Sequence, residues 1–185
     1  MKNLNFFTVL SLSATLFSAT TLAAGTSSVE MTFEAELTST TCKAQIVDAQ
    51  GTPTSVIDYG EVFKSEIANK SRVVKFSIHY SDCSGVSGII LDAKPGSGGT
   101  CSGVNADGNS YAAGKNAAFE LWLGDVDRGT ELLCSGSYDI FPWMPSKDNS
   151  DLPISSRIVV AKGFDIKDVN EGAVSAPITF VSTYK

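Results

Sequence analysis

The strongest constraint on the fold is a two-residue alternation of apolar and polar side chains along several short stretches. The clearest example covers residues 74–80, where polar residues separate Val74, Phe76, Ile78 and Tyr80. A period of two is typical of a β-strand with one face buried and the other exposed to water. The same reasoning predicts further strands at residues 29–37, 55–60, 88–93, 118–123, 131–133, 154–162 and 177–184.

No stretch after residue 23 has the 3.6-residue period of a long amphipathic helix. About eight short strands separated by turn residues, with no helix, predict an all-β antiparallel sandwich. The chain has 185 residues, of which 43% are hydrophobic and 18% charged, and these values fit a single globular domain. Acidic residues outnumber Lys and Arg by 20 to 14, so the sequence lacks the basic surface that a nucleic-acid partner requires.

Residues 1–23 are typical of a secretory signal peptide. Lys2 precedes an apolar stretch, and the segment ends in the small residue Ala23. A membrane anchor would need about 20 apolar residues, whereas Ser and Thr interrupt this stretch every few positions. We therefore expect export and cleavage after Ala23, with Ala24 as the alternative.

Export changes the expected role of the four cysteines, which are Cys42, Cys83, Cys101 and Cys134. In an oxidising compartment an even number of cysteines favours disulfides over a metal site. No CxxC pair occurs and the chain has a single histidine, so we expect no zinc site. Three pairings are possible at this point. Residues 94–115 are rich in Gly, Ser and Asn, which predicts a long loop that a Cys101–Cys134 bridge would tether.

The sequence contains no group of residues typical of an enzyme. His79 belongs to the polar face of its predicted strand, away from any core. Residues 85–88 lack the spacing of a GxSxG nucleophile turn, and no helix follows the glycines at 96–99 to form a phosphate cradle. An acidic string at residues 125–131 has the oxygen ligands that calcium prefers, but a connection between two strands explains the same residues. We therefore predict no catalytic residue, no metal and no cofactor.

Four segments share a pattern with one known family: residues 33–42, 58–60, 81–83 and 152–163. They resemble the pilin subunits of bacterial chaperone-usher fimbriae, the type 1/K99-like fimbrial proteins. Residues 33–42 are similar to the first strand of that family, which runs into the first cysteine. Asp58-Tyr59-Gly60 is similar to the family's aliphatic-Asp-Leu-Gly strand, and Ser81-Asp82-Cys83 is similar to the end of its third strand. Residues 152–163 resemble its Leu-Pro-Phe-x-Ala-Arg-Tyr strand.

The C-terminal end carries the most specific resemblance. The family ends with a penultimate tyrosine, alternating apolar residues before it and a glycine fourteen residues from the end, here Tyr184, Phe180, Ile178 and Gly172. The loop at residues 94–115 and the pair of Cys101 and Cys134 lie outside the common pattern. They mark a specialised member.

The resemblance implies an incomplete immunoglobulin-like β-sandwich that is completed by a donor strand from another subunit. It further implies a Cys42–Cys83 disulfide. The donor strand would lie in a groove beside Gly172, Ile178, Phe180 and Tyr184, where main-chain hydrogen bonds give affinity and alternate side chains give specificity. The implied partners are a periplasmic chaperone, an outer-membrane usher and neighbouring pilin subunits, and the implied destination is a fimbrium on the cell surface.

Within this scheme the chain divides into three segments. Residues 1–23 are the signal peptide, residues 24–32 are the N-terminal extension and candidate donor strand, and residues 33–185 are the pilin domain. Val29 and Met31 are the side chains that the extension would insert. Because only residues 24–28 precede Val29, donation either overlaps the start of the first strand or is weak in this subunit.

The resemblance predicts a structural subunit, and the extra cysteine pair and long loop favour a minor one. An alternative is an adhesive subunit that binds a host glycan or protein, a host surface receptor, through the 94–115 loop and the region of Trp143. A third hypothesis is a secreted enzyme or inhibitor with a complete sandwich, which would work as a free monomer.

Overall fold

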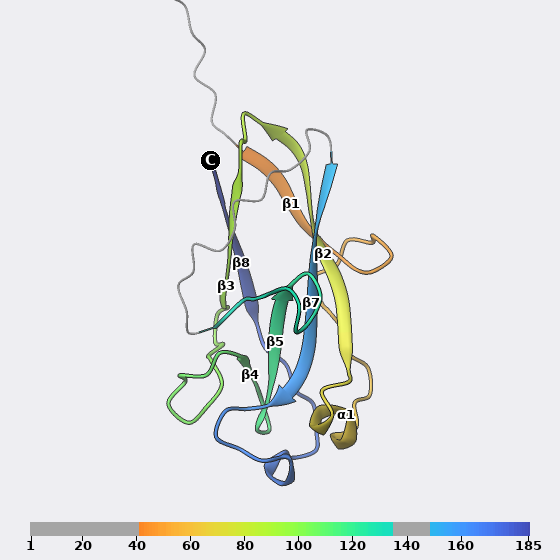
Figure 1. Cartoon of the computed structure of the whole chain (residues 1–185), viewed down its shortest axis with the longest axis vertical. Coiled ribbons are helices and arrows are strands. Elements are labelled where there is room, and N and C mark those ends of the chain that lie inside the picture. Colours follow the sequence, from red (N-terminus) through yellow and green to blue (C-terminus); the bar gives the residue numbers. More distant parts are fainter. Residues whose placement is uncertain (1–40, 135–148) are drawn as a thin grey trace, which may run out of the picture. The chain divides into compact units, whose positions relative to one another are not determined.

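The computed structural model of the chain describes residues 41–134 and 149–185, which form two β-sheets (Figure 1). The predicted signal peptide, the predicted strand at 29–37 and the donor residues Val29 and Met31 lie outside the described residues. Trp143 lies outside them as well. In the described part of the chain, no helix is sufficiently long and apolar to span a membrane.

The larger sheet has the order β1-β2-β7-β5-β4, and all its neighbours are antiparallel. Figure 1 shows β7 between β2 and β5 at the centre of this sheet. Phe76 of β2 lies opposite Ile154 of β7, and Leu121 of β5 lies opposite Ser156, so these side chains share one face. The strands are β1 (Thr41–Val47), β2 (Val73–Ser84), β4 (Tyr111–Gly114), β5 (Ala117–Leu123) and β7 (Asn149–Val160), and a short β6 (Thr130–Glu131) pairs with β5.

The second sheet consists of β3 (Ile89–Pro95) and β8 (Ile178–Tyr184), paired antiparallel. The register places Ile89 opposite Tyr184 and Pro95 opposite Ile178. The inward side chains of β3 pack with those of the larger sheet in one apolar core. The alternation at residues 74–80 is confirmed, because Phe76, Ile78 and Tyr80 are each at most 4% exposed. The two sheets therefore form a sandwich.

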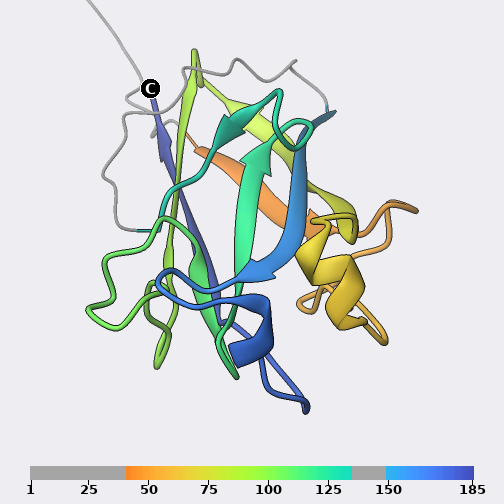
Figure 2. The same ribbon diagram turned by 60° about the horizontal axis from the view of Figure 1, so that its bottom comes forward.

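Two short helical turns lie at one end of the larger sheet, and Figure 2 brings this end forward. Helix α1 (Lys64–Ala68) begins where the Glu66 carboxylate accepts the backbone N–H of Phe63, and it buries Ile67. The 3₁₀ turn at Ile166–Asp168 contacts α1. The prediction of no helix is wrong for these two elements, since a single turn is too short to show a 3.6-residue period.

Most predicted strands are confirmed with shifted ends, while two predictions need correction. Residues 94–115 are not a loop throughout, because the segment begins with the end of β3 and finishes in β4, which pairs with β5. Small residues such as Ala112 and Ala113 gave no strand signal there. Residues 55–60 are not a β-strand. A strand requires a neighbour to pair with, and among the described residues this segment has none.

Candidate strand-acceptor groove

One edge of β8 has no neighbouring strand in the described part of the chain. Lys185 and Gly88 exchange both backbone hydrogen bonds, with N···O distances of 2.9 and 3.2 Å. Hydrogen-bonded pairs of this kind occur at every second residue of an antiparallel ladder. The backbone N–H and C=O groups of the odd-numbered residues of β8 therefore point toward β3. The backbone N–H and C=O groups of Ile178, Phe180 and Ser182 then point toward the opposite edge, where none of the described strands pairs with them.

The inward side chains of β8 are only half-buried, unlike those of its partner strand. Ile178, Phe180 and Tyr184 face the core but keep intermediate exposure. Directly across the sheet, Ile89 and Leu91 are 1% and 3% exposed. Both strands belong to the same sandwich, so the difference means that the described part of the chain covers β8 less completely than β3.

A groove of about 1480 Å³ runs along this uncovered side. Its floor is the inner face of the larger sheet, one wall is formed by residues 55–64, and the other wall is formed by residues 169–180. Gly172, with a φ of +123° in the region that favours glycine, lines it together with Ile178 and Phe180. Sequence reasoning missed several lining residues, which are Ile57, Tyr59, Phe76, Phe119, Ile158, Val174 and Ala176. Of these, Val174 and Ala176 continue the alternation that the sequence already showed at 178–184.

Residues 55–60, which we call the wall segment, line the groove and belong to no helix or strand. The Tyr59 hydroxyl donates to Ser156 Oγ at 2.6 Å, and its ring contacts Phe119 at a centroid distance of 4.9 Å. Burial raises the pKa of Tyr59 well above its ordinary value. Gly60 has a φ of +62° and donates its backbone N–H to the Asp58 carboxylate. The Asp-Tyr-Gly motif therefore ends the wall segment in a tight turn.

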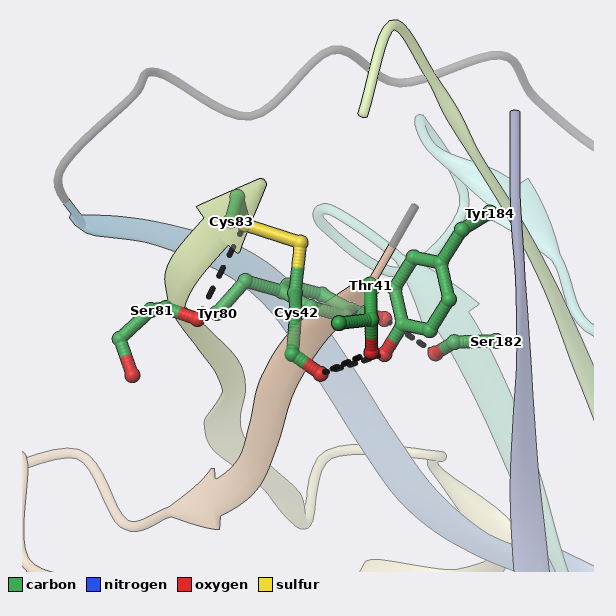
Figure 3. The surroundings of a disulfide bond; sticks show 7 residues. All are labelled: Thr41, Cys42, Tyr80, Ser81, Cys83, Ser182 and Tyr184. Atoms are coloured by element: carbon green, nitrogen blue, oxygen red, sulfur yellow. Dashed lines mark hydrogen bonds between the residues drawn. A yellow bond between two sulfur atoms is a disulfide. The ribbon is translucent and has the colours of Figure 1, made fainter. Parts of the chain in front are cut away.

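The Tyr184 end of β8 is tied to the larger sheet, as Figure 3 shows. The Tyr184 hydroxyl donates to the carbonyl of Cys42 at 3.1 Å, and the hydroxyls of Tyr80 and Ser182 lie 2.6 Å apart. The Cys42–Cys83 disulfide joins β1 and β2 at this end, which confirms the implied pairing. Tyr184 is not among the residues that line the groove. The groove therefore lies along the Gly172 end of β8 and does not reach the end beside this disulfide.

The second disulfide, Cys101–Cys134, is also present, with a Cα–Cα distance of 5.5 Å. It fixes the segment before β4, where the hydroxyls of Ser102 and Ser110 are buried 2.8 Å apart. The Tyr111 hydroxyl donates toward the carbonyls of Ala93 and Leu132. This connection is therefore pinned to the sandwich by covalent and polar contacts.

The other residues singled out in the sequence lie apart from the groove. His79 Nδ1 is 2.6 Å from an Asp151 oxygen, and neither residue lines the groove. In the acidic string, Asp125 pairs with Lys75, whereas both oxygens of Asp127 accept from Arg157. Asp125 and Asp127 thus have separate cations, and the described residues contain no group of three side chains that could hold a metal.

Comparison with known proteins places these features in a family. No protein-family model matches the chain. The chain is 32% identical over 185 residues to an uncharacterized fimbrial-like protein, YadL, of Escherichia coli, and the match covers 94% of this chain and 92% of the relative.

Two solved structures share the fold. The P pilus rod subunit PapA has a TM-score of 0.55 and 19% identity, covering 78% of this chain and 99% of that chain. A chain from the structure of a chaperone-usher pilus has a TM-score of 0.56 and 18% identity, covering 86% and 96%. These proteins are structural subunits, not enzymes. The chain therefore belongs to the fimbrial (pilin) subunit family, and its described residues form an incomplete immunoglobulin-like β-sandwich.

Proposed function

We propose that the chain is a structural subunit of a chaperone-usher fimbria and polymerises by donor-strand complementation. The observation that carries this proposal is the open edge of β8 beside an apolar groove of about 1480 Å³. Backbone groups that no described strand pairs with and half-buried apolar side chains occur there together. A strand from a second subunit would satisfy both, because β-augmentation combines main-chain hydrogen bonds with side chains in pockets.

The energy of such a contact is large enough for a fibre. Val29 and Met31, buried at about 1.5 to 3 kcal/mol each, contribute about 3 to 6 kcal/mol. The three N–H and three C=O groups of Ile178, Phe180 and Ser182 add about 1 kcal/mol each. Part of this sum offsets the lost freedom of the two subunits. The remainder is consistent with a long-lived, noncovalent polymer.

In this proposal residues 1–23 direct export, residues 24–32 form the donor extension, and residues 33–185 form the pilin domain. Val29 and Met31 of one subunit would fill the groove of the next, in contact with Gly172, Ile178 and Phe180. Before that exchange a periplasmic chaperone covers the groove, and an outer-membrane usher passes the subunit to the fimbrium on the cell surface. Tyr184 would position the end of β8 through its contact with Cys42.

The test is expression of the full chain without a chaperone, with and without a synthetic peptide of residues 24–37. We expect aggregation of the chain alone and a soluble one-to-one complex with the peptide. The control peptide carries Val29→Asp and Met31→Asp, which keep its length but remove the inserted apolar side chains. A stable, soluble monomer in the absence of any peptide would contradict the open groove.

Adhesion to a host surface receptor through residues 94–115 is the second candidate, and it belongs with a minor subunit. One observation favours it: Val104 is 81% exposed on a segment that a disulfide and buried hydroxyls pin in place. In this candidate Val104 is the side chain that contacts the receptor. We expect Val104→Asp to abolish host-cell binding while fibres still form. Unchanged binding would remove the support for this candidate.

A further inference from the structure

The wall segment, residues 55–60, is fixed in position although no strand pairs with it among the described residues. Its side chains alternate, with Ile57 and Tyr59 half-buried and Val56 70% exposed. No described residue accepts or donates a backbone hydrogen bond at Ile57. The segment therefore has the side-chain alternation of a strand without the ladder that would hold one.

Arg72 supplies a contact that replaces part of the missing ladder. Arg72 directly precedes β2, which begins at Val73. Its Nη2 donates to the carbonyl of Tyr59 at 2.5 Å. Its Nη1 lies 3.8 Å from Glu66, the residue whose other oxygen accepts the N–H of Phe63 at the start of α1. One guanidinium thus connects the wall segment to helix α1, and the backbone of Arg72 leads directly into β2.

The remaining guanidinium nitrogen shows that this contact is directional. Arg72 Nε is buried and has no hydrogen-bond partner among the described residues. An arginine placed only for its own solvation would expose or pair that donor. The side chain is instead oriented so that Nη2 reaches the Tyr59 carbonyl.

We propose that Arg72 is a positioning residue for strand capture, which holds the wall segment ready as the second edge for the arriving strand. The inference rests on the proposed function, because it concerns the same groove. A strand that enters between β8 and the wall segment would pair with both. If the wall segment were loose, its ordering would oppose binding, since fixing one residue's backbone has an entropic cost.

The expected effect follows from that cost. Releasing one or two residues of the wall segment should weaken the affinity for an inserted strand by roughly tenfold to a hundredfold. The probe is the synthetic peptide of residues 24–37, bound to the full chain. The variants are Arg72→Met, which removes the contact, and Arg72→Lys, which keeps the charge and one donor. Arg128→Met is the matched control, because Arg128 is exposed and does not line the groove.

Two readouts separate positioning from general stability. We expect Arg72→Met to weaken peptide binding and to raise amide exchange at residues 55–60, with exchange in β2 and β7 unchanged. Arg72→Lys should restore part of the affinity, and Arg128→Met should bind as the wild type does. If Arg72→Met does not fold, Arg72→Lys takes its place. A weaker affinity of Arg72→Lys for the peptide, with amide exchange in β2 equal to that of the wild type, then supports the same conclusion.

The outcomes also separate this inference from the proposed function. Equal affinities of the wild type and the folded Arg72 variants would overturn the role of Arg72 while leaving strand capture intact. A wild-type chain that does not bind the peptide would instead count against the proposed function itself. Faster exchange throughout the sandwich in Arg72→Met would show a structural role only and would overturn the inference.

Discussion

Replacing Phe180 with alanine tests whether the groove is a site for an apolar strand. Phe180 lines the groove and is half-buried, and its ring packs edge-on against Phe76 with centroids 6.1 Å apart. A fully buried Phe→Ala substitution costs about 3 to 5 kcal/mol. With one side of the ring open, we expect Phe180→Ala to lower the free energy of unfolding of the unoccupied chain by about 1 to 2 kcal/mol.

Filling the groove changes this value because a strand would bury the exposed side of the ring. In the occupied chain the same substitution should then cost about 3 to 4 kcal/mol. The difference of about 2 kcal/mol appears as a roughly thirtyfold weaker affinity for the peptide of residues 24–37. The assay is made at high dilution, below the concentration at which the unoccupied chain aggregates, and combines denaturant unfolding of both states with a titration of the peptide.

Val181→Ala is the matched control for Phe180→Ala. Val181 is the next residue of β8, is 40% exposed and does not line the groove. We expect its replacement to leave the peptide affinity within about twofold of the wild type. Equal costs of Phe180→Ala in the free and occupied chains would refute the idea that a strand covers this ring.

Three further predictions concern the frame around the groove. Arg157→Met should lower the free energy of unfolding by about 3 kcal/mol, since Arg157 is 5% exposed and its loss leaves Glu120 without its buried partner; a cost below about 1 kcal/mol in urea unfolding would contradict this. The Arg157 hydrogen bond lowers the pKa of Asp127 in the folded chain. The ionised Asp127 therefore stabilises the fold above its unfolded-state pKa, and this stabilisation is lost as the pH falls through its folded-state pKa. The free energy of unfolding of Asp127→Asn, measured as a function of pH, should lack this contribution. Replacing Cys101 and Cys134 together by serine, which opens a link across 33 residues, should cost about 4 kcal/mol, and calorimetry showing an unchanged Tm would disagree.

Local sequence was sufficient to predict the strands whose two faces differ. Phe76 and Ile78 point inward and Lys75 points outward because the pleat alternates, whatever the partner strand is. The same holds for Ile178 and Phe180 at the C-terminus. Helix α1 could not be found this way, because its start depends on a single contact between Glu66 and the backbone of Phe63.

Pairing of strands could not be predicted from local sequence. Residues 55–60 have an apolar character suited to a strand, but they are not one among the described residues, since a ladder needs a neighbour at a fixed distance. Conversely, Ala112 and Ala113 have a weak strand signal and still form β4, because β5 lies beside them. In both cases the deciding partner is remote in sequence.

The sequence by itself determined which residues alternate, that an exported chain with four cysteines favours disulfides, and that the C-terminal motif resembles a pilin. Only the tertiary structure decided that no described strand pairs with the outer edge of β8, that the wall segment lines the groove beside it, and that Arg72 donates to the Tyr59 carbonyl. The physical reason is that period and composition are properties of neighbouring residues. A groove is defined by which surfaces are left uncovered after distant strands have packed.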